Sequence, residues 1–286
     1  MPGSMMLPDL SAVTPEGGVR AAALARWQEQ GWPGHRAEAW RYTRLDRLAD
    51  LDLAPVTGLA GTASGPADDA ARGIGAHVLR FVNGVFDPAG LSDLPEGMTI
   101  VDLGSDEAAL SRLADLAPAG HPVSDLSLAV MSGGILIDIT GAVDAPLMVI
   151  FEGDDSKASA HPAMLVRLAE GASLQLAEWH QSSVGLAAPL IGYDIGAGAR
   201  LEQVKVQAEG AEVAHLAATG VALSDGASVA GFSLSTGAAL ARLETHVTMQ
   251  GEGADCQLSA IYMGRGTQHQ DITTYMDHAV ANCTSN

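Results

Sequence analysis

A Gly-Ala pair recurs through the second half of the chain at a nearly constant interval, and this repeat constrains the fold more than any other feature. The pairs begin at Gly171, Gly198, Gly226 and Gly253, which are 27, 28 and 27 positions apart. Turn residues at a fixed interval, separated by short apolar runs, are typical of a coil of stacked parallel strands. One turn of such a coil cannot bury its own apolar face, so neighbouring turns must cover it. From residue 133 onward the sequence therefore predicts a parallel β-helix.

Charge and composition argue against several classes of function. The chain has 15 basic and 34 acidic residues, a formal net charge of −19, which argues against non-specific binding to nucleic acid or to an anionic membrane. A membrane-spanning helix needs about 20 apolar residues, and no apolar stretch of the sequence approaches this length. The N-terminus has no secretory leader pattern. Two cysteines in 286 residues indicate a reducing compartment rather than a disulfide framework. We therefore expect a cytoplasmic protein.

Four regions are expected along the chain. They are an N-terminal helical segment (1–53), a linker or exposed loop (54–75), an α+β region with a hairpin (76–132) and the β-helix core (133–286). In the first region, a helix is expected to end at Gly31 and Pro33, and a second to begin near Ala37. The third region is expected to contain a hairpin at Asn83-Gly84, a strand from Met98 and helices at 105–116 and 124–131.

Alignment of the repeats predicts which residues stack on neighbouring strands, about 4.8 Å apart. The Gly-Ala pairs place five residues in one column: Leu174, Leu201, Val229, Cys256 and Cys283. A second, interleaved series of glycines predicts two polar columns near the end of the chain. The first holds His215, Arg242 and His269, and the second holds Ala217, Glu244 and Asp271. We interpret Gly192–Gly198 as turn residues and not as a phosphate-binding loop, because no Lys-Ser/Thr follows them.

Three parts of the sequence carry a family resemblance. Trp27–Leu48 contains a Gly-Trp-Pro turn followed by a Glu-x-Trp-Arg-Tyr-Thr signature that ends at Thr43. Phe81–Ile100 contains an Asn-Gly hairpin and a Ser-x-Leu-Pro-x-Gly continuation, and two stretches of the repeat begin at His161 and Gln268. Together they resemble the SufD branch of the SufB/SufD family of iron–sulfur cluster assembly scaffold proteins.

The resemblance implies a mainly β fold, in which a right-handed parallel β-helix follows a small α-helical and α+β N-terminal region. It implies a scaffold subunit of the SUF machinery, not an enzyme, that acts with SufB and with the ATPase SufC. It further implies a transient iron–sulfur cluster at the interface with SufB. Family members continue with further turns and a C-terminal domain that binds the ATPase. We therefore expect this chain to be truncated at its C-terminus.

Candidate cluster-binding residues are His269, Asp271, His278 and Cys283 in the last repeat, where the densest polar group is His269, Asp271, Asp277 and His278. They either belong to a subunit interface near the assembly site or form a solvated face of the coil. Cys256 and Cys283 could ligate iron as neighbouring thiols, but the aliphatic residues in their column favour a buried core. No Cys-x-x-Cys or His-Glu-x-x-His motif is present, so no resident metal site is predicted.

Other functions stay open at this point. The paralogue SufB shares the same core, and the Trp-Arg-Tyr-Thr signature favours SufD over it. A carbohydrate-active β-helix enzyme would need a carboxylate pair, which Glu244 and Asp271 could supply if they stack in one column. A purely structural solenoid is a third alternative. Trp40 and Tyr42 either dock the N-terminal segment onto the body of the protein or form a recognition patch.

Overall fold

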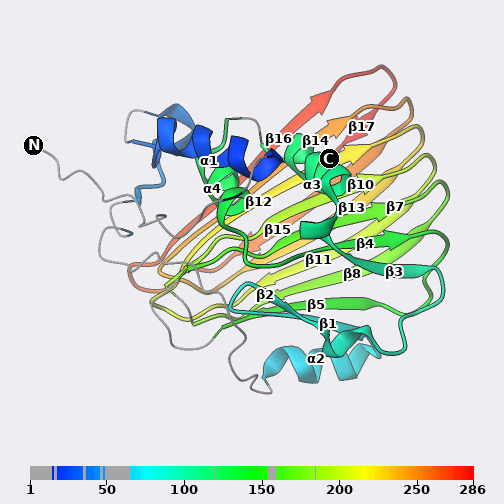
Figure 1. Cartoon of the computed structure of the whole chain (residues 1–286), viewed down its shortest axis with the longest axis horizontal. Helices are drawn as coiled ribbons and strands as arrows, with labels where there is room; N and C mark the ends of the chain where they lie inside the picture. The colour runs from blue at the N-terminus through cyan, green and yellow to red at the C-terminus, as the bar shows by residue number, and fades with distance from the viewer. Residues whose placement is uncertain are drawn as a thin grey trace, which may run out of the picture.

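A computed structural model describes residues 15, 18–34, 37–45, 48, 65–118, 120–153, 159–183 and 185–286. Two facing sheets of mostly parallel strands form a solenoid of about five turns, and helices pack on its outer surface (Figure 1). This arrangement confirms the predicted mainly β fold with a parallel β-helix core. The chain passes from one sheet to the other in each turn, so consecutive strands of a turn lie in different sheets. Strands one repeat apart lie side by side in the same sheet and are hydrogen-bonded to each other.

The two sheets are named A and B here. Sheet A contains β3 (Met98–Asp102), β4 (Gly134–Ile139), β7 (Ala163–Leu168), β10 (Leu190–Ile195), β12 (Ala214–Leu223), β14 (Leu240–Met249) and β16 (His269–His278). Sheet B contains β1 (His77–Val82), β2 (Val85–Asp87), β5 (Leu147–Glu152), β8 (Ser173–His180), β11 (Arg200–Gln207), β13 (Ser228–Ser235), β15 (Asp255–Tyr262) and β17 (Thr284–Ser285). Two short strands, β6 (Ser159–Ala160) and β9 (Leu186–Ala187), extend the ladder beside β12. Only β1–β2 and β3–β4 pair in antiparallel fashion among the described strands.

The predicted column in sheet B is confirmed over four of its five residues. Leu174, Leu201, Val229 and Cys256 are direct partners on successive strands. The fifth position was predicted wrongly, because Ser285 and not Cys283 pairs with Cys256. The last connection is two residues longer than the repeat, so Cys283 lies in the turn before β17 begins.

The predicted polar columns of sheet A are wrong. Arg242 pairs with Leu216 on one side and with Asp271 on the other, and Glu244 lies between Ala218 and Thr273. The separation between paired residues is 26 positions from β12 to β14 and 29 positions from β14 to β16. The connecting turns in this sheet therefore differ in length, and a fixed interval of 27 shifts the alignment.

Glycines at the turns explain the regular interval in sheet B. Gly171, Gly198, Gly226 and Gly253 all have positive φ, between 62° and 73°. A left-handed backbone conformation there is accessible to glycine at little cost and is costly for a residue with Cβ. The Gly-Ala repeat is therefore a series of turn signals, as predicted.

The N-terminal helices are α1 (Gly18–Gln30), the 3₁₀ turn η1 (Glu38–Trp40) and α2 (Pro66–Ile74), and further along the chain lie α3 (Glu107–Leu116) and α4 (Pro122–Val130). Two more 3₁₀ turns, η3 (Pro88–Leu91) and η4 (Leu103–Ser105), flank β3. A helix was expected to begin near Ala37. The residues described there form only the short 3₁₀ turn η1. Residues 66–74, expected in a linker or loop, form a helix, while 54–64 lie outside the described residues. Asp68 accepts a hydrogen bond from the Gly65 amide, and Gly75 ends this helix with φ of 65°.

Helices α3 and α4 cover the outer face of sheet A, and α1 packs on these two helices (Figure 1). Glycines in the sheet make this close approach feasible. A Cβ at Gly220 in β12 would lie 1.9 Å from the carbonyl oxygen of Leu116, and one at Gly192 in β10 would lie 2.9 Å from the Leu113 side chain. Gly192 therefore lies in a strand beneath α3, and the expectation that it is a turn residue was wrong. The helices and sheet A share one hydrophobic core, and a second core fills the space between the sheets.

Candidate functional site

The four residues predicted for cluster binding lie at two different ends of the last long strand. His269 and Asp271 lie at the beginning of β16, and His278 is its last residue. A strand rises about 3.3 Å per residue, so the two ends are about 30 Å apart. Cys283 follows β16, and its sulfur lies 3.3 Å from the carbonyl oxygen of Gly251. The structure therefore separates the predicted group into two pairs and does not bring it together in one site.

Asp271 belongs to a network of charged groups that joins the N-terminal segment to the solenoid. Its Oδ2 atom lies 2.5 Å from Nη1 of Arg242 and accepts a hydrogen bond from the hydroxyl of Thr43. Nε2 of His269 lies 3.5 Å from the same hydroxyl. The Arg242 guanidinium also lies 4.3 Å from the ring centre of Trp40. The residues of the Trp-Arg-Tyr-Thr signature therefore dock on the last turns, while Tyr42 itself is 78% exposed.

Glu244 is fully engaged on the other side of Arg242. One oxygen accepts hydrogen bonds from Nε and Nη2 of Arg242, at 2.9 and 2.6 Å, and the other lies 2.8 Å from Nε2 of His246. Nε2 of His121, the N-cap residue of α4, lies 3.3 Å from the first oxygen. Burial alone would raise the pKa of Glu244, but these histidines and Arg242 lower it below its usual value. Glu244 and Asp271 both pair with Arg242, an arrangement that does not favour the free carboxylate pair required of a glycosidase or lyase.

The two cysteines do not form a thiol pair. Cys256 is buried in the core between the sheets, and this burial raises the pKa of its thiol to about 12. Cys283 is partly exposed in the turn after β16. A thiol with a raised pKa is a poor nucleophile and a poor ligand. The core interpretation of Cys256 therefore agrees with its surroundings.

The interior of the solenoid contains a group of charged residues that the sequence analysis did not identify. Glu178 in β8 accepts hydrogen bonds from Tyr193 and from Gln203, the latter at 2.8 Å, and lies 3.4 Å from Nζ of Lys205. Burial would raise the pKa of Glu178, but Lys205, His180 and Tyr193 lower it to about 2. Side chains alternate between the two faces of a strand, so every second residue of β8 and β11 points inward. This alternation could have shown that the polar residues lie on the same inward face as the buried aliphatic residues of these strands.

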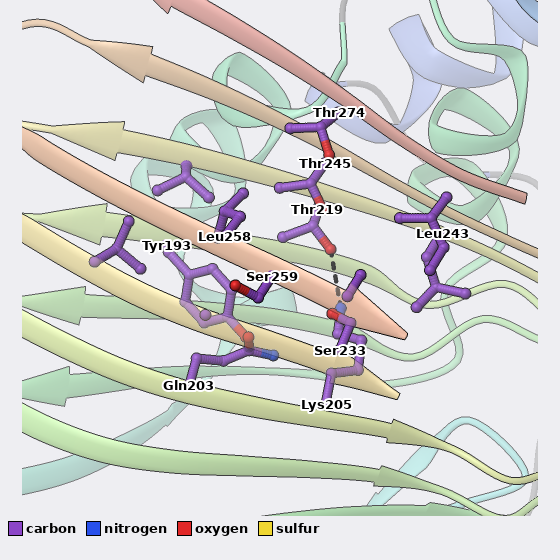
Figure 2. A pocket seen from close by; sticks show the side chains of 15 residues that line it. Tyr193, Gln203, Lys205, Thr219, Ser233, Leu243, Thr245, Leu258, Ser259 and Thr274 are labelled. Atoms are coloured by element: carbon purple, nitrogen blue, oxygen red, sulfur yellow. Dashed lines mark hydrogen bonds between the residues drawn. The ribbon is translucent and has the colours of Figure 1, made fainter. Parts of the chain in front are cut away.

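A narrow cavity of about 80 Å³ connects this charged group with the later turns. Figure 2 shows side chains from both sheets projecting into it, with Thr219, Thr245 and Thr274 in a row on sheet A and Ser233 and Ser259 on sheet B. Nζ of Lys205 donates a hydrogen bond of 3.1 Å to Thr219 (Figure 2). The cavity is lined by both hydroxyl and aliphatic side chains and holds space for a few water molecules, but it is too small for a sugar or a nucleotide.

One further buried group has the composition of a metal site. Donor atoms of His180, Glu209 and His215 all lie within 4.8 Å of one another. The three residues come from the end of β8, from the turn after β11 and from the start of β12. The three residues occupy different positions of the repeat, so no single column of the sequence alignment contains all three.

Fold and site together define a parallel β-solenoid protein whose charged residues tie its own parts together. Within this class, residues 150–286 match the family model described as SUF system FeS cluster assembly, SufBD core domain. The second half of the chain is therefore similar to a SufBD core domain, and the resemblance to the SufB/SufD family is confirmed.

Two curated proteins are similar over most of the chain. The iron–sulfur cluster assembly protein SufD of Escherichia coli (strain K12) is 27% identical over 263 residues, which cover 89% of this chain and 61% of that protein. An iron–sulfur cluster assembly SufBD family protein of Mycobacterium leprae (strain TN) is 25% identical over 254 residues, which cover 89% of this chain and 58% of the relative. The chain thus spans about three fifths of the length of these relatives. None of the described helices has the length and hydrophobicity needed to span a lipid bilayer.

Proposed function

We propose that this chain is a non-catalytic scaffold subunit of the SUF iron–sulfur cluster assembly machinery, and that it acts in the cytoplasm with SufB and the ATPase SufC. The observation that carries the proposal is the match of residues 150–286 to the SufBD core domain. The similarity to SufD of Escherichia coli extends over 89% of the chain and favours a SufD-type subunit over the paralogue SufB. ATP hydrolysis belongs to SufC in this proposal.

The charged residues pair with one another, and this pairing supports a scaffold more than an enzyme. Arg242 binds both Glu244 and Asp271, and the hydroxyl of Thr43 is held by the same group. An acid or base that acts on a substrate needs access to it and a suitable pKa. These groups instead connect the N-terminal segment to the last turns of the solenoid.

The iron–sulfur cluster is the cargo of this proposed function and forms transiently at an interface with SufB. Of the residues singled out in the sequence, His278 and Cys283 suit such an interface better than Asp271. His278 is exposed and Cys283 is partly exposed, whereas Asp271 is engaged by Arg242. We therefore assign the candidate contact with the cargo to the end of β16 that carries His278 and Cys283.

Removal of the gene in the source cells tests this function. The expected result is reduced activity of iron–sulfur enzymes under iron limitation or oxidative stress, and recovery when the gene is returned. Return of a Cys283→Ser, His278→Ala double variant should restore less activity than the wild type. A matched control is Glu170→Ala, at an exposed position in the turn before β8. Unchanged iron–sulfur enzyme activities in the deletion strain would instead favour a purely structural solenoid, and cleavage of an acidic polysaccharide with Ca²⁺ would favour a carbohydrate-active enzyme.

A further inference from the structure

We propose that His180, Glu209 and His215 bind one divalent transition metal ion inside the solenoid. One donor atom from each residue lies within 4.8 Å of the other two. The residues are buried, with 1%, 5% and 0% of their surface exposed. Ligands bind Zn²⁺ at about 2.0–2.2 Å, which places their donor atoms about 3–4 Å apart. Small side-chain rotations are therefore enough to close the group around an ion.

The fold holds the three residues at one corner of the coil. His180 ends β8 and pairs in register with Gln207 at the end of β11. Glu209 follows two residues later, and after a short turn the chain enters β12, where His215 is the second residue. Two adjacent turns of the solenoid thus supply the ligands. The strands that carry His180 and His215 are fixed in parallel ladders, and Glu209 lies in the connection between β11 and β12.

Four polar atoms in this group have no hydrogen-bond partner among the described residues. They are Nε2 of His180, Oε1 of Glu209, and Nδ1 and Nε2 of His215. Nδ1 of His215 lies 2.8 Å from the other oxygen of Glu209, so these two side chains are already in close contact. An unpaired buried polar group costs about 1–3 kcal/mol, so natural proteins leave few of them. A metal ion would satisfy the imidazole and carboxylate atoms together.

Neighbouring residues orient the proposed ligands. Nε2 of Gln207 donates a hydrogen bond of 3.0 Å to Oε2 of Glu209. The amide oxygen of Gln207 in turn accepts hydrogen bonds from the hydroxyl of Ser235 and the backbone amide of Gly237, at 2.9 and 3.1 Å. The Phe151 ring stacks on His180 with a centroid distance of 4.4 Å. Residues that hold the ligands in this way are a regular part of metal sites.

The charges around the group suit a cation. The carboxylate of Glu178 lies 3.4 Å from Nε2 of His180 and adds negative charge, while the ammonium of Lys205 beyond it is paired with Glu178. Neutral imidazole and ionised carboxylate are the forms that bind metals.

Two imidazoles and one carboxylate favour Zn²⁺ or Fe²⁺ among the common ions. Because the ligands are buried, we expect the ion to enter while the chain folds. The test therefore produces the untagged chain in medium supplemented with Zn²⁺ alone or Fe²⁺ alone, the latter purified without oxygen, and measures metal by mass spectrometry. The expected result is close to one ion per chain for at least one of the two metals.

Variants and spectroscopy make the test specific. His215→Ala should reduce the bound metal at least tenfold while the circular dichroism spectrum stays that of the wild type. The matched control is His161→Ala, because His161 is a buried histidine that contacts Ser127 and Ser159 and lies outside the group. Where His215→Ala does not fold, X-ray absorption of the wild-type zinc form decides, with two imidazole nitrogens expected.

Three results would overturn the metal site: less than a tenth of an ion per chain with both metals, full metal content in folded His215→Ala, or an absorption spectrum without two imidazoles. None of these readouts uses SufB, SufC or cluster assembly. Failure of the metal site is therefore distinguishable from failure of the proposed scaffold function.

Discussion

The guanidinium carbon of Arg242 lies 4.3 Å from the ring centre of Trp40, although the two residues are separated by most of the chain. Trp40 also packs against the ring of His121, the N-cap residue of α4, with a centroid distance of 5.3 Å. Arg242 pairs with Glu244 and Asp271 at the same time. This contact therefore connects the N-terminal signature, the helical layer and the last turns of the solenoid.

Trp40→Ala should destabilise the protein through loss of this contact. Trp40 is 4% exposed, and removal of a buried tryptophan side chain costs about 3–5 kcal/mol. Urea unfolding followed by circular dichroism measures the change in the free energy of unfolding. The control is Tyr42→Ala in the same signature, which should cost less than about 0.5 kcal/mol because its side chain is exposed. Equal losses for both variants would contradict the docking of the N-terminal segment.

Gly220→Ala should disturb the packing of α3 on sheet A. A Cβ at this position would lie 1.9 Å from the carbonyl oxygen of Leu116, so the helix must shift. Overpacking of this kind costs about 1–3 kcal/mol, and a lower melting temperature is expected in calorimetry. Gly210→Ala is the matched control, since no atom lies closer than 3.8 Å to its added Cβ. An unchanged melting temperature for Gly220→Ala would show that α3 does not pack there.

Leu201→Asp tests the register of sheet B. Leu201 is fully buried between Leu174 and Val229, so the new carboxylate would be unpaired in the core. We expect a loss of about 3–5 kcal/mol, which is a large part of the roughly 5–15 kcal/mol that stabilises a typical domain. Val204→Asp lies on the same strand with a side chain that is 45% exposed, and it should remain folded. Wild-type thermal stability of Leu201→Asp would refute the register.

The stability of the protein should fall in mild acid because of His161. Burial lowers the pKa of this residue from 6.5 to about 3. Between these values the unfolded chain binds a proton that the folded chain does not, so stability is present above pH 6.5 and is lost as the pH falls towards 3. One such proton contributes a slope of about 1.4 kcal/mol per pH unit.

His161→Asn removes this titrating group and should reduce the slope by that amount between pH 6 and pH 4, which are approximate bounds inside the window. Urea unfolding at several pH values measures the slope. His278→Asn replaces an exposed histidine at the end of β16 and serves as the control, with the slope of the wild type expected. The same slope in His161→Asn and wild type would contradict the buried, neutral state of His161.

The sequence predicts the solenoid well because its turns in sheet B recur at intervals of 27 or 28 residues with glycines of positive φ. The stack of Leu174, Leu201, Val229 and Cys256 follows directly from that interval. In sheet A the paired residues are 26 and 29 positions apart in the last turns, and the same reasoning misplaces Arg242, Glu244 and Asp271. Turn length is decided by local hydrogen bonds that no repeat pattern reveals.

The candidate site was less accessible to sequence reasoning than the fold. The contact of Trp40 with Arg242 and that of Thr43 with Asp271 join segments about 200 residues apart, which a local pattern does not report. His180, Glu209 and His215 come together because two strands end at one corner of the coil. The family resemblance required only the order of short motifs, so it could be recognised before any of these contacts.

The most direct test of the scaffold function is co-purification at natural abundance. The protein is tagged at its N-terminus at the native locus and purified from the source cells, and the bound proteins are identified by mass spectrometry. Tyr42→Ala serves as a folded reference, and Trp40→Ala tests whether the docked N-terminal segment matters for the assembly. The account predicts that SufB and SufC accompany the wild-type protein. A folded protein that is recovered without either of them would contradict it.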